Sequence, residues 1–454
     1  MLWRAPWIQQ RGWLIALAGW DLAAVFLSYN IVYLNRIGAW EGLSKGLIVA
    51  LLIWLAASYI SGRYSPRSNE EKSVAKLAST SLLAAGCVLA VFITHSWTHQ
   101  IVDATTRFRG FLLPFCALSV ILSCGGQLAI EYRRNKSVHW YGVCTEHERR
   151  IIEGELAAET SIGGVQIIFK NGLCLHEFDV QRYIGANQGL VVGALEDEDR
   201  ETREVLIKMR EKGIEIVSIV DWCERYLHRI PPEIIDQNWL IKADGFKIRP
   251  GRTSWRVKRL VDIVVASTLL VITSPLFVAA CVCIWIEDGM PIFYVQTRTG
   301  TNGSKVSIWK LRSMRKDAEA SGIQWSTRGD KRITKVGKVI RKLRIDELPQ
   351  LMAVIVGELS LIGPRPERPE LESELERHIP HYRIRHWVRP GLSGWAQVCY
   401  PYGASIEDSR NKLSYDIYYI RNGGLLLDAL IFLKTVRLVM TASGSTPRDN
   451  AIRY

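Results

Sequence analysis

The chain has 454 residues, of which 48% are hydrophobic, and it carries a formal net charge of +13. This length allows two or three folding units of ordinary size. The sequence has neither a basic stripe with interleaved aromatics nor a known nucleic-acid-binding module, which argues against nucleic acid as a partner. None of the nine cysteines shows metal-ligand spacing or a CxxC pair, so neither a zinc site nor a disulfide framework is indicated.

Four apolar runs open the chain, and each is close to the ~20 residues that a helix needs to cross the hydrocarbon core. They are Trp13–Leu34, Leu43–Ile60, Leu77–Trp97 and Phe111–Ile130. We therefore expect a four-helix transmembrane region over residues 1–135. Basic residues gather before the first run and after the second and fourth, so the positive-inside rule places those segments in the cytoplasm. Asp21 lies inside the first run, and we expect it to pair within the bundle.

Between residues 136 and 232, short apolar runs alternate with charged helical stretches, as in GLVVGAL followed by EDEDRETREVLIKMREKG. This alternation is typical of βαβ units around a parallel sheet and predicts a Rossmann-like α/β cytosolic domain. The first strand leads into Gly142-Val-Cys-Thr-Glu rather than GxGxxG, which favours a structural or regulatory role over dinucleotide binding. Residues 233–254, which begin after Pro231-Pro232, are expected to form a linker.

A fifth apolar segment, Val261–Ile286, determines on which side of a membrane the C-terminal region lies. Ser274-Pro275 falls at its middle, where the proline removes a backbone donor and the serine can supply a replacement. A helix over residues 258–287 that enters the membrane, breaks at Ser274-Pro275 and returns would keep the flanking regions on one side. A kinked helix that spans the membrane is the alternative.

Six segments then follow one another in a fixed order: KRLVDIVVASTLLVITSP, FYVQTRTGTNG, IWKLRSM, RKLRIDELPQLMAVIVGELSLIGPRPERP, VRPGLSGWAQV and YDIYYIRN. This ordered set resembles the bacterial sugar transferases, which are monotopic phosphoglycosyl transferases acting on polyprenyl phosphate. The resemblance implies a mainly α catalytic domain over residues 255–454 that contains a re-entrant membrane helix. With its upstream helices and α/β domain, the chain is similar to the large undecaprenyl-phosphate glucose or galactose phosphotransferases.

The resemblance implies transfer of a hexose 1-phosphate from a UDP-sugar to undecaprenyl phosphate, with release of UMP, as the first step of exopolysaccharide, capsule or O-antigen synthesis. Glucose 1-phosphate is the first expectation and galactose 1-phosphate the alternative. It also implies a multi-pass protein among the lipids of the bacterial inner membrane. Its catalytic domain would face the cytoplasm, where nucleotide sugars are found. The helix bundle and the α/β domain offer surfaces for a homodimer.

Two other classes of protein remain as alternatives. A glycosyltransferase that moves only the sugar would usually show a DxD-type metal motif, which the catalytic region lacks. A non-catalytic membrane scaffold of polysaccharide export would not require an intact set of acidic and basic residues. This chain has such an intact set, which argues against the scaffold.

Asp346-Glu347 lies between a basic amphipathic segment and an apolar one. Adjacent carboxylates repel and need a cation to stay ionised together, and Mg²⁺ suits such oxygen ligands. A carboxylate can also attack phosphorus and divide one displacement into two. By resemblance, Asp346 is the nucleophile that forms a covalent aspartyl-phosphosugar intermediate. Glu347 is assigned to positioning and, together with Asp346, to the metal.

Phosphoryl transfer depends on positioning and charge neutralisation, so basic side chains should converge on this acidic pair. Four residues within the ordered motifs are the candidate substrate-binding residues: Lys310, Arg341, Arg365 and Arg389. Prolines flank Arg365 and follow Arg389, which restricts the backbone at both positions. Arg298 and Arg312 rank lower, because either could contact lipid headgroups instead.

Overall fold

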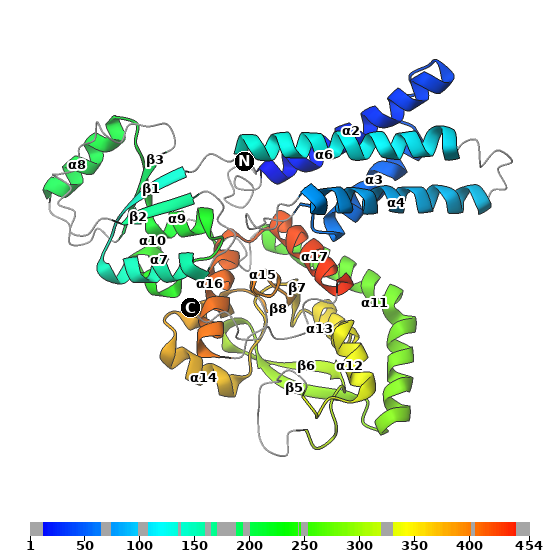
Figure 1. Ribbon diagram of the computed structural model, residues 1–454. Coiled ribbons are helices and arrows are strands. Elements are labelled where there is room, and N and C mark those ends of the chain that lie inside the picture. The colour runs from blue at the N-terminus through cyan, green and yellow to red at the C-terminus, as the bar shows by residue number, and fades with distance from the viewer. Residues whose placement is uncertain are drawn as a thin grey trace. The chain divides into compact units, whose positions relative to one another are not determined.

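The computed structural model describes residues 12–64, 74–98, 108–134, 138–158, 165–169, 188–193, 200–243, 245–246, 253–318, 330–400 and 405–441 (Figure 1). The chain divides into two compact units, Met1–Leu227 and His228–Tyr454. The first contains long apolar helices followed by a small α/β region, and the second contains the acidic pair and its neighbouring motifs.

Long apolar helices begin the first unit: α2 (Gly12–Ile37), α3 (Lys45–Ile60), α4 (Val74–Thr98) and α6 (Leu113–Arg134), the last preceded by the π-helical turn η3 (Phe108–Leu112). Among the described residues of this unit, three segments are long and apolar enough to cross a membrane: α2, the part of α4 to Thr94, and Gly110–Ile130. The second predicted span is shorter than expected. Ser44 caps α3 and the chain turns at Ser61, which leaves a helix of 16 residues. That length falls just below what a spanning helix needs.

A buried polar cluster joins these helices. Asp21 and Arg63 form an ion pair at 3.1 Å, and both side chains are fully buried. The Tyr64 hydroxyl and the Gln127 amide donate hydrogen bonds to Asp21 at 2.7 and 3.0 Å, and the Ser123 hydroxyl donates a third. The expected pairing of Asp21 within the bundle is therefore confirmed. Its partners come from α6 and from the turn after α3.

The described residues of the α/β region form a parallel sheet with the strand order β2-β1-β3-β4. Its elements are β1 (Val138–Val143), α7 (Glu146–Ala158), β2 (Val165–Phe169), β3 (Gln188–Val192), α8 (Arg200–Glu211), β4 (Glu215–Ser218) and α9 (Ile219–Tyr226). The parallel sheet that the alternating pattern predicted is confirmed. At the start of α7, the carboxylate of Glu148 accepts hydrogen bonds from the backbone and the hydroxyl of Thr145 at 2.9 and 3.0 Å. An acidic group of the chain thus already lies at this helix N-terminus, where positive partial charge accumulates.

The apolar helix of the second unit, α11 (Thr253–Asp288), is 36 residues long and has Pro275 inside it. It is long and apolar enough to cross a membrane, and Figure 1 shows that it bends along its length. Pro275 has no N–H to donate to the carbonyl of Val271, and the Ser274 hydroxyl donates to that carbonyl at 2.8 Å instead. The helix therefore continues through Ser274-Pro275, where the sequence predicted a break.

The rest of the second unit is mainly helical, as predicted. Its helices are α10 (Gln237–Lys242), α12 (Lys335–Lys342), α13 (Gln350–Val356), α14 (Pro369–His378), α15 (Trp395–Cys399), α16 (Ile406–Asn422) and α17 (Leu425–Met440). Its short 3₁₀ turns are η6 (Pro232–Ile234), η7 (Thr301–Gly303), η8 (Ile345–Glu347) and η9 (Tyr382–Trp387). β5 (Phe293–Thr299) and β6 (Lys305–Leu311) form an antiparallel hairpin, and β7 (Ser360–Ile362) pairs in parallel with β8 (Gly391–Ser393). The expected linker, 233–254, contains α10 and most of η6.

One hydrophobic cluster connects α11 to the acidic pair. It consists of Ala280 and Ile284 from the second half of α11, Leu311 from β6, Ile340 from α12 and Ile345 from η8. Each of these side chains is at most 6% exposed. Burial of Ile345 in this cluster fixes the turn that carries the next two residues, the predicted catalytic carboxylates.

Candidate active site

The β5–β6 hairpin presents a polar face to the acidic pair. Side chains alternate along each strand, and Tyr294 lies directly opposite Lys310 across the hairpin. Gln296 and Arg298 therefore share the face that carries Lys310, whereas Val295 and Trp309 lie on the opposite, exposed face. On the polar face, the Lys310 ammonium lies 3.5 Å from a carboxylate oxygen of Glu347.

The turn η8 presents Asp346 and Glu347 next to each other. Arg344, directly before this turn, has a φ of 58°, a left-handed conformation that only some residues adopt readily. This conformation separates the end of α12 from η8 and lets Ile345 enter the core. The Arg344 guanidinium lies 3.7 Å from Glu347 and contributes a second positive charge to the site.

Glu347 is the neutralised member of the acidic pair. Arg365 donates a hydrogen bond to it at 2.6 Å, and it also forms ion pairs with Lys310 and Arg344. Burial alone would raise the pKa of Glu347, but the charges of Arg365, Lys310 and Arg344 outweigh it and hold that pKa well below its usual value. Glu347 is therefore a permanent anion that fixes the positions of three basic side chains.

Asp346 has a different environment although it is the adjacent residue. It is 8% exposed, and among the described residues its Oδ1 atom has no hydrogen-bond partner. Burial and the neighbouring charge of Glu347 raise the pKa of Asp346 to about 6, against the opposing charges of Lys310, Arg344 and Arg341. Neighbouring carboxylates whose pKa values are moved apart are typical of sites where the two groups have different chemical roles. A mostly ionised, relatively basic carboxylate with one oxygen free of hydrogen bonds among the described residues is suited to nucleophilic attack.

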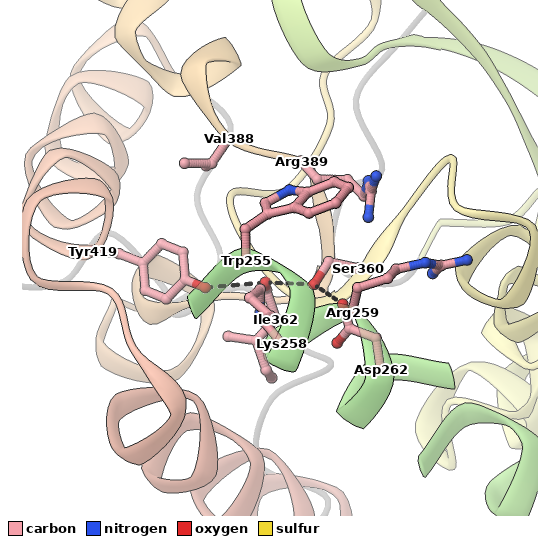
Figure 2. A pocket seen from close by; sticks show the side chains of 9 residues that line it. All are labelled: Trp255, Lys258, Arg259, Asp262, Ser360, Ile362, Val388, Arg389 and Tyr419. Carbon is pink, nitrogen blue, oxygen red and sulfur yellow. Dashed lines mark hydrogen bonds between the residues drawn. The ribbon is translucent and has the colours of Figure 1, made fainter. Parts of the chain in front are cut away.

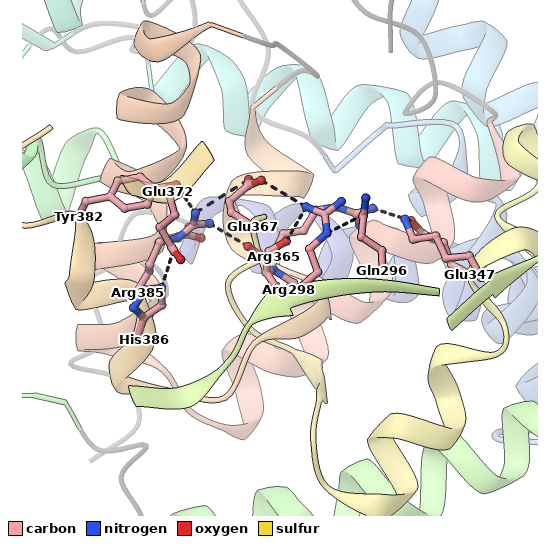
Figure 3. Close-up of polar contacts among 12 residues, drawn as sticks. Gln296, Arg298, Glu347, Arg365, Glu367, Glu372, Tyr382, Arg385 and His386 are labelled. Atoms are coloured by element: carbon pink, nitrogen blue, oxygen red, sulfur yellow. Dashed lines mark hydrogen bonds and ion pairs between the residues drawn. The ribbon is translucent and has the colours of Figure 1, made fainter. Parts of the chain in front are cut away.

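A network of polar contacts holds Arg365 in place (Figure 3). Arg385 donates a hydrogen bond to the backbone carbonyl of Arg365 at 2.9 Å and pairs with Asp416 at 3.0 Å. On the hairpin side, Arg298 donates to Gln296 at 2.8 Å, and Figure 3 shows both side chains beside Arg365. These contacts fix the backbone of Arg365 and the side chains next to it, and so limit where its guanidinium can lie.

The structure brings three of the four predicted basic residues to the acidic pair. Lys310 and Arg365 contact Glu347 directly, and Arg341 of α12 lies close enough for its charge to act on Asp346. Burial lowers the pKa of Lys310 to about 8, with the charge of Glu347 opposing this effect, so the side chain remains a cation at neutral pH. Arg389 has no described contact with the acidic pair.

Sequence reasoning missed Arg344 and Arg385 and underrated Arg298. Arg344 is only two residues before Asp346, so its position in RKLRIDE was a usable signal. Alternation along β5 could have assigned Arg298 to the face of Lys310. No local signal identifies Arg385, because its contact with Arg365 depends on the packing of η9. Arg312 instead pairs with Asp288 at 3.1 Å, at the end of α11.

The acidic pair fits a divalent cation only in part. The described residues contain no group of three or more histidine, cysteine, aspartate or glutamate side chains that could hold a metal ion. However, Mg²⁺ is commonly bound through one or two carboxylates together with substrate phosphates. The unpartnered Oδ1 atom of Asp346 fits that mode, whereas the carboxylate of Glu347 is already engaged by Arg365, Lys310 and Arg344.

Comparison with known proteins places this site in a sequence family. The model of the bacterial sugar transferase family matches residues 253–442. A UDP-N-acetylgalactosamine-undecaprenyl-phosphate N-acetylgalactosaminephosphotransferase of Aeromonas hydrophila is 47% identical over 189 residues, which are 42% of this chain and 45% of that protein.

Two relatives share the name UDP-glucose:undecaprenyl-phosphate glucose-1-phosphate transferase. The protein of Caulobacter vibrioides is 37% identical over 205 residues, which cover 44% of this chain and 77% of that protein. The protein of Escherichia coli strain K12 is 34% identical over 182 residues, which cover 40% of this chain and 39% of that protein. The match thus spans less than half of the A. hydrophila and E. coli proteins and more than two thirds of the C. vibrioides protein.

Proposed function

The chain belongs to the bacterial sugar transferase family, and we propose that it transfers a hexose 1-phosphate from a UDP-sugar to undecaprenyl phosphate and releases UMP. The observation that carries this proposal is the unequal environment of Asp346 and Glu347. Within the described part of the chain, Asp346 has an oxygen atom without a hydrogen-bond partner, whereas three basic side chains surround Glu347. The names of the three relatives, which give undecaprenyl phosphate as acceptor, support it.

In the first half-reaction, a carboxylate oxygen of Asp346 attacks the phosphorus that bears the sugar. The new O–P bond forms while the bond from that phosphorus to the bridging oxygen breaks, and UMP leaves with the electron pair. The raised pKa of Asp346, about 6, increases the basicity of the attacking oxygen and still leaves it mostly ionised at pH 7. Splitting the transfer in this way produces a covalent aspartyl-phosphosugar intermediate.

In the second half-reaction, a phosphate oxygen of undecaprenyl phosphate attacks the same phosphorus, and the bond to Asp346 breaks. The carboxylate is regenerated and the hexose is left on an undecaprenyl diphosphate. Arg365 and Lys310, held by Glu347, supply the positive charge that the phosphoryl oxygens need during both displacements. Mg²⁺ bound by Asp346 and the donor phosphates would add further charge neutralisation at the pyrophosphate.

We assign UDP-glucose as the donor, because the relatives from C. vibrioides and E. coli are named glucose-1-phosphate transferases. The name of the 47% identical relative favours UDP-N-acetylgalactosamine as the second candidate. UDP-galactose, the alternative from sequence, completes the set of donors to compare.

The test is a donor panel with the purified full chain, undecaprenyl phosphate and Mg²⁺, in which UMP and UDP are measured separately. Release of UMP with one of the three donors supports the proposal. Release of UDP would identify a transferase that moves only the sugar, and absence of both products would favour a scaffold. Without acceptor, a donor labelled with ³²P in the sugar-linked phosphate should label the wild-type protein and not Asp346→Asn.

For the membrane arrangement, we propose that α11 is re-entrant, with both ends at the cytoplasmic face of the bacterial inner membrane. The bend of α11 in Figure 1 and the charged residues near its two ends, Arg259 and Glu287, support this arrangement. A cysteine placed at the exposed Ser307, beyond the second end, tests it. A membrane-impermeant maleimide should label Ser307→Cys only after cell lysis, with the unsubstituted chain as background, and labelling in intact cells would instead indicate a spanning helix.

A further inference from the structure

A pocket at the first turns of α11 contains Arg389, the predicted basic residue that the structure does not bring to Asp346 (Figure 2). Trp255 and Arg259 come from α11, Ser360 comes from β7, and Arg389 lies just before β8. The guanidinium carbon of Arg389 lies 5.1 Å from the centroid of the Trp255 ring, a cation–π contact. Among the described residues, the Arg389 guanidinium has neither a hydrogen bond nor an ion pair.

The acidic side chains near this pocket are engaged elsewhere. Asp262 accepts hydrogen bonds from the Ser360 hydroxyl at 2.7 Å and from the Leu361 backbone at 3.2 Å. Asp428 pairs with Lys258 at 2.8 Å. Buried carboxylates that already have partners are costly to rearrange. Asp262 and Asp428 therefore do not serve as counter-ions for Arg389.

A second guanidinium adds to the positive charge of the pocket. Arg259 donates hydrogen bonds to the carbonyls of Val354 and Ile355, in the last turn of α13, where helix carbonyls lack partners within the helix. This contact fixes Arg259 beside Arg389. Burial and then the charge of Arg259 lower the pKa of Arg389, and Asp262 opposes them only in part. A bound anion would relieve this repulsion.

The surface next to the pocket is apolar. One turn further along α11, Leu260, Val261 and Val264 are 62%, 42% and 55% exposed, on a helix apolar enough to enter a membrane. A tryptophan and basic residues at the start of such a helix are typical of the depth of lipid headgroups. A lipid could therefore place its phosphate at the guanidinium groups and its hydrocarbon chain along α11.

We infer that Trp255, Arg259 and Arg389 bind the phosphate group of a membrane lipid, at a site separate from the Asp346–Glu347 pair. Two lipids carry this chemistry, an anionic phospholipid and undecaprenyl phosphate. The inference rests on the proposed function only for the membrane position of α11, and a binding measurement tests it without any transfer reaction.

The experiment uses the full chain in nanodiscs of phosphatidylcholine, to which phosphatidylglycerol or undecaprenyl phosphate is added in separate arms. Native mass spectrometry counts the bound lipid, and the thermal midpoint reports the stabilisation that binding produces. We expect Arg389→Gln to weaken the apparent affinity for one of these lipids about tenfold or more, in line with the loss of a charge-assisted contact. The affinity of Arg389→Lys should lie between those of the wild type and Arg389→Gln, because lysine keeps the positive charge and loses the planar guanidinium fork.

The matched control is Arg256→Gln, which removes an exposed arginine of the same helical turn. It should bind as the wild type does. A response to phosphatidylglycerol alone identifies a phospholipid site, and a response to undecaprenyl phosphate identifies a site that holds this lipid apart from the reacting phosphorus. Equal losses of affinity in Arg256→Gln and Arg389→Gln would show that the lipid responds to surface charge in general, and would overturn the inference. The inference would also be overturned if the wild-type protein bound neither lipid in preference to phosphatidylcholine. This second outcome is measured on the wild type and does not depend on whether a variant folds.

Discussion

Two buried aspartates, one in each unit of the chain, lie next to basic side chains and yet differ in how their oxygens are used. Asp21, in the apolar helices, forms an ion pair with Arg63 and accepts hydrogen bonds from Tyr64, Ser123 and Gln127. Asp346 has an oxygen without any partner among the described residues. The arginine that could neutralise the acidic pair, Arg365, contacts Glu347 instead.

This difference separates a structural carboxylate from a reactive one. A fully partnered buried acid contributes to the stability of its arrangement, because removal of any partner leaves an uncompensated charge. An unpartnered acid costs stability and remains available for chemistry. The same substitution, aspartate to asparagine, should therefore have opposite consequences at the two positions.

At Asp346, the substitution to asparagine should reduce transfer by about 10³-fold or more, because a neutral amide replaces the nucleophilic carboxylate. The thermal midpoint of Asp346→Asn should be equal to or above that of the wild type, since the substitution removes a buried charge that burial and Glu347 disfavour. UMP release and thermal unfolding in one detergent check both statements. A variant with normal transfer would contradict the nucleophile assignment.

At Asp21, the substitution to asparagine should lower the free energy of unfolding by about 3 kcal/mol, because Arg63 keeps its buried charge and loses its counter-ion. Denaturant unfolding in mixed micelles measures the change. The double variant Asp21→Asn, Arg63→Met serves as the control and should recover much of the loss. If the single variant were as stable as the wild type, the two aspartates would not differ in the way that their contacts indicate.

A pH series should reveal the cost of the Asp346 charge. The folded-state pKa of about 6 lies above the usual value of 3.8, so folding disfavours the ionised form. Relative to Asp346→Asn, the wild type should therefore lose stability as the pH rises from about 4 to about 6, by on the order of 2 kcal/mol. Thermal unfolding of both proteins in a chelator, without substrate, measures the difference, and a difference that does not change with pH would contradict the raised pKa.

Arg365→Lys should produce the smallest of these effects, a decrease in kcat/KM of about tenfold. The lysine keeps the charge beside Glu347 but loses the planar fork that can contact Glu347 and a phosphate together. The control is Arg383→Lys, in an arginine that is 80% exposed and pairs with Glu376 at the surface. Such pairs contribute little, so the control should match the wild type. Equal kinetics for both variants would remove Arg365 from the site.

Much of the candidate site could be predicted from the sequence. Asp346, Glu347, Lys310 and Arg365 each lie in a motif of the ordered set, and the structure brings them together. The replacement of a hydrogen bond by Ser274 could also be predicted, because proline chemistry is local. The position of Arg389 could not, since it depends on the loop before β8 packing against the first turns of α11.

The sequence by itself determined the apolar helices, the parallel sheet and the location of the acidic pair, because hydrophobic periodicity and residue chemistry act over short stretches of chain. Only the tertiary structure decided which of the two carboxylates is neutralised. Glu347 forms ion pairs with Lys310, on a strand, and with Arg365, beyond α13. The packing of these elements sets the distances from both basic groups to Glu347. Burial and nearby charge then move the pKa values of Asp346 and Glu347 in opposite directions, a difference that two adjacent acidic letters do not contain.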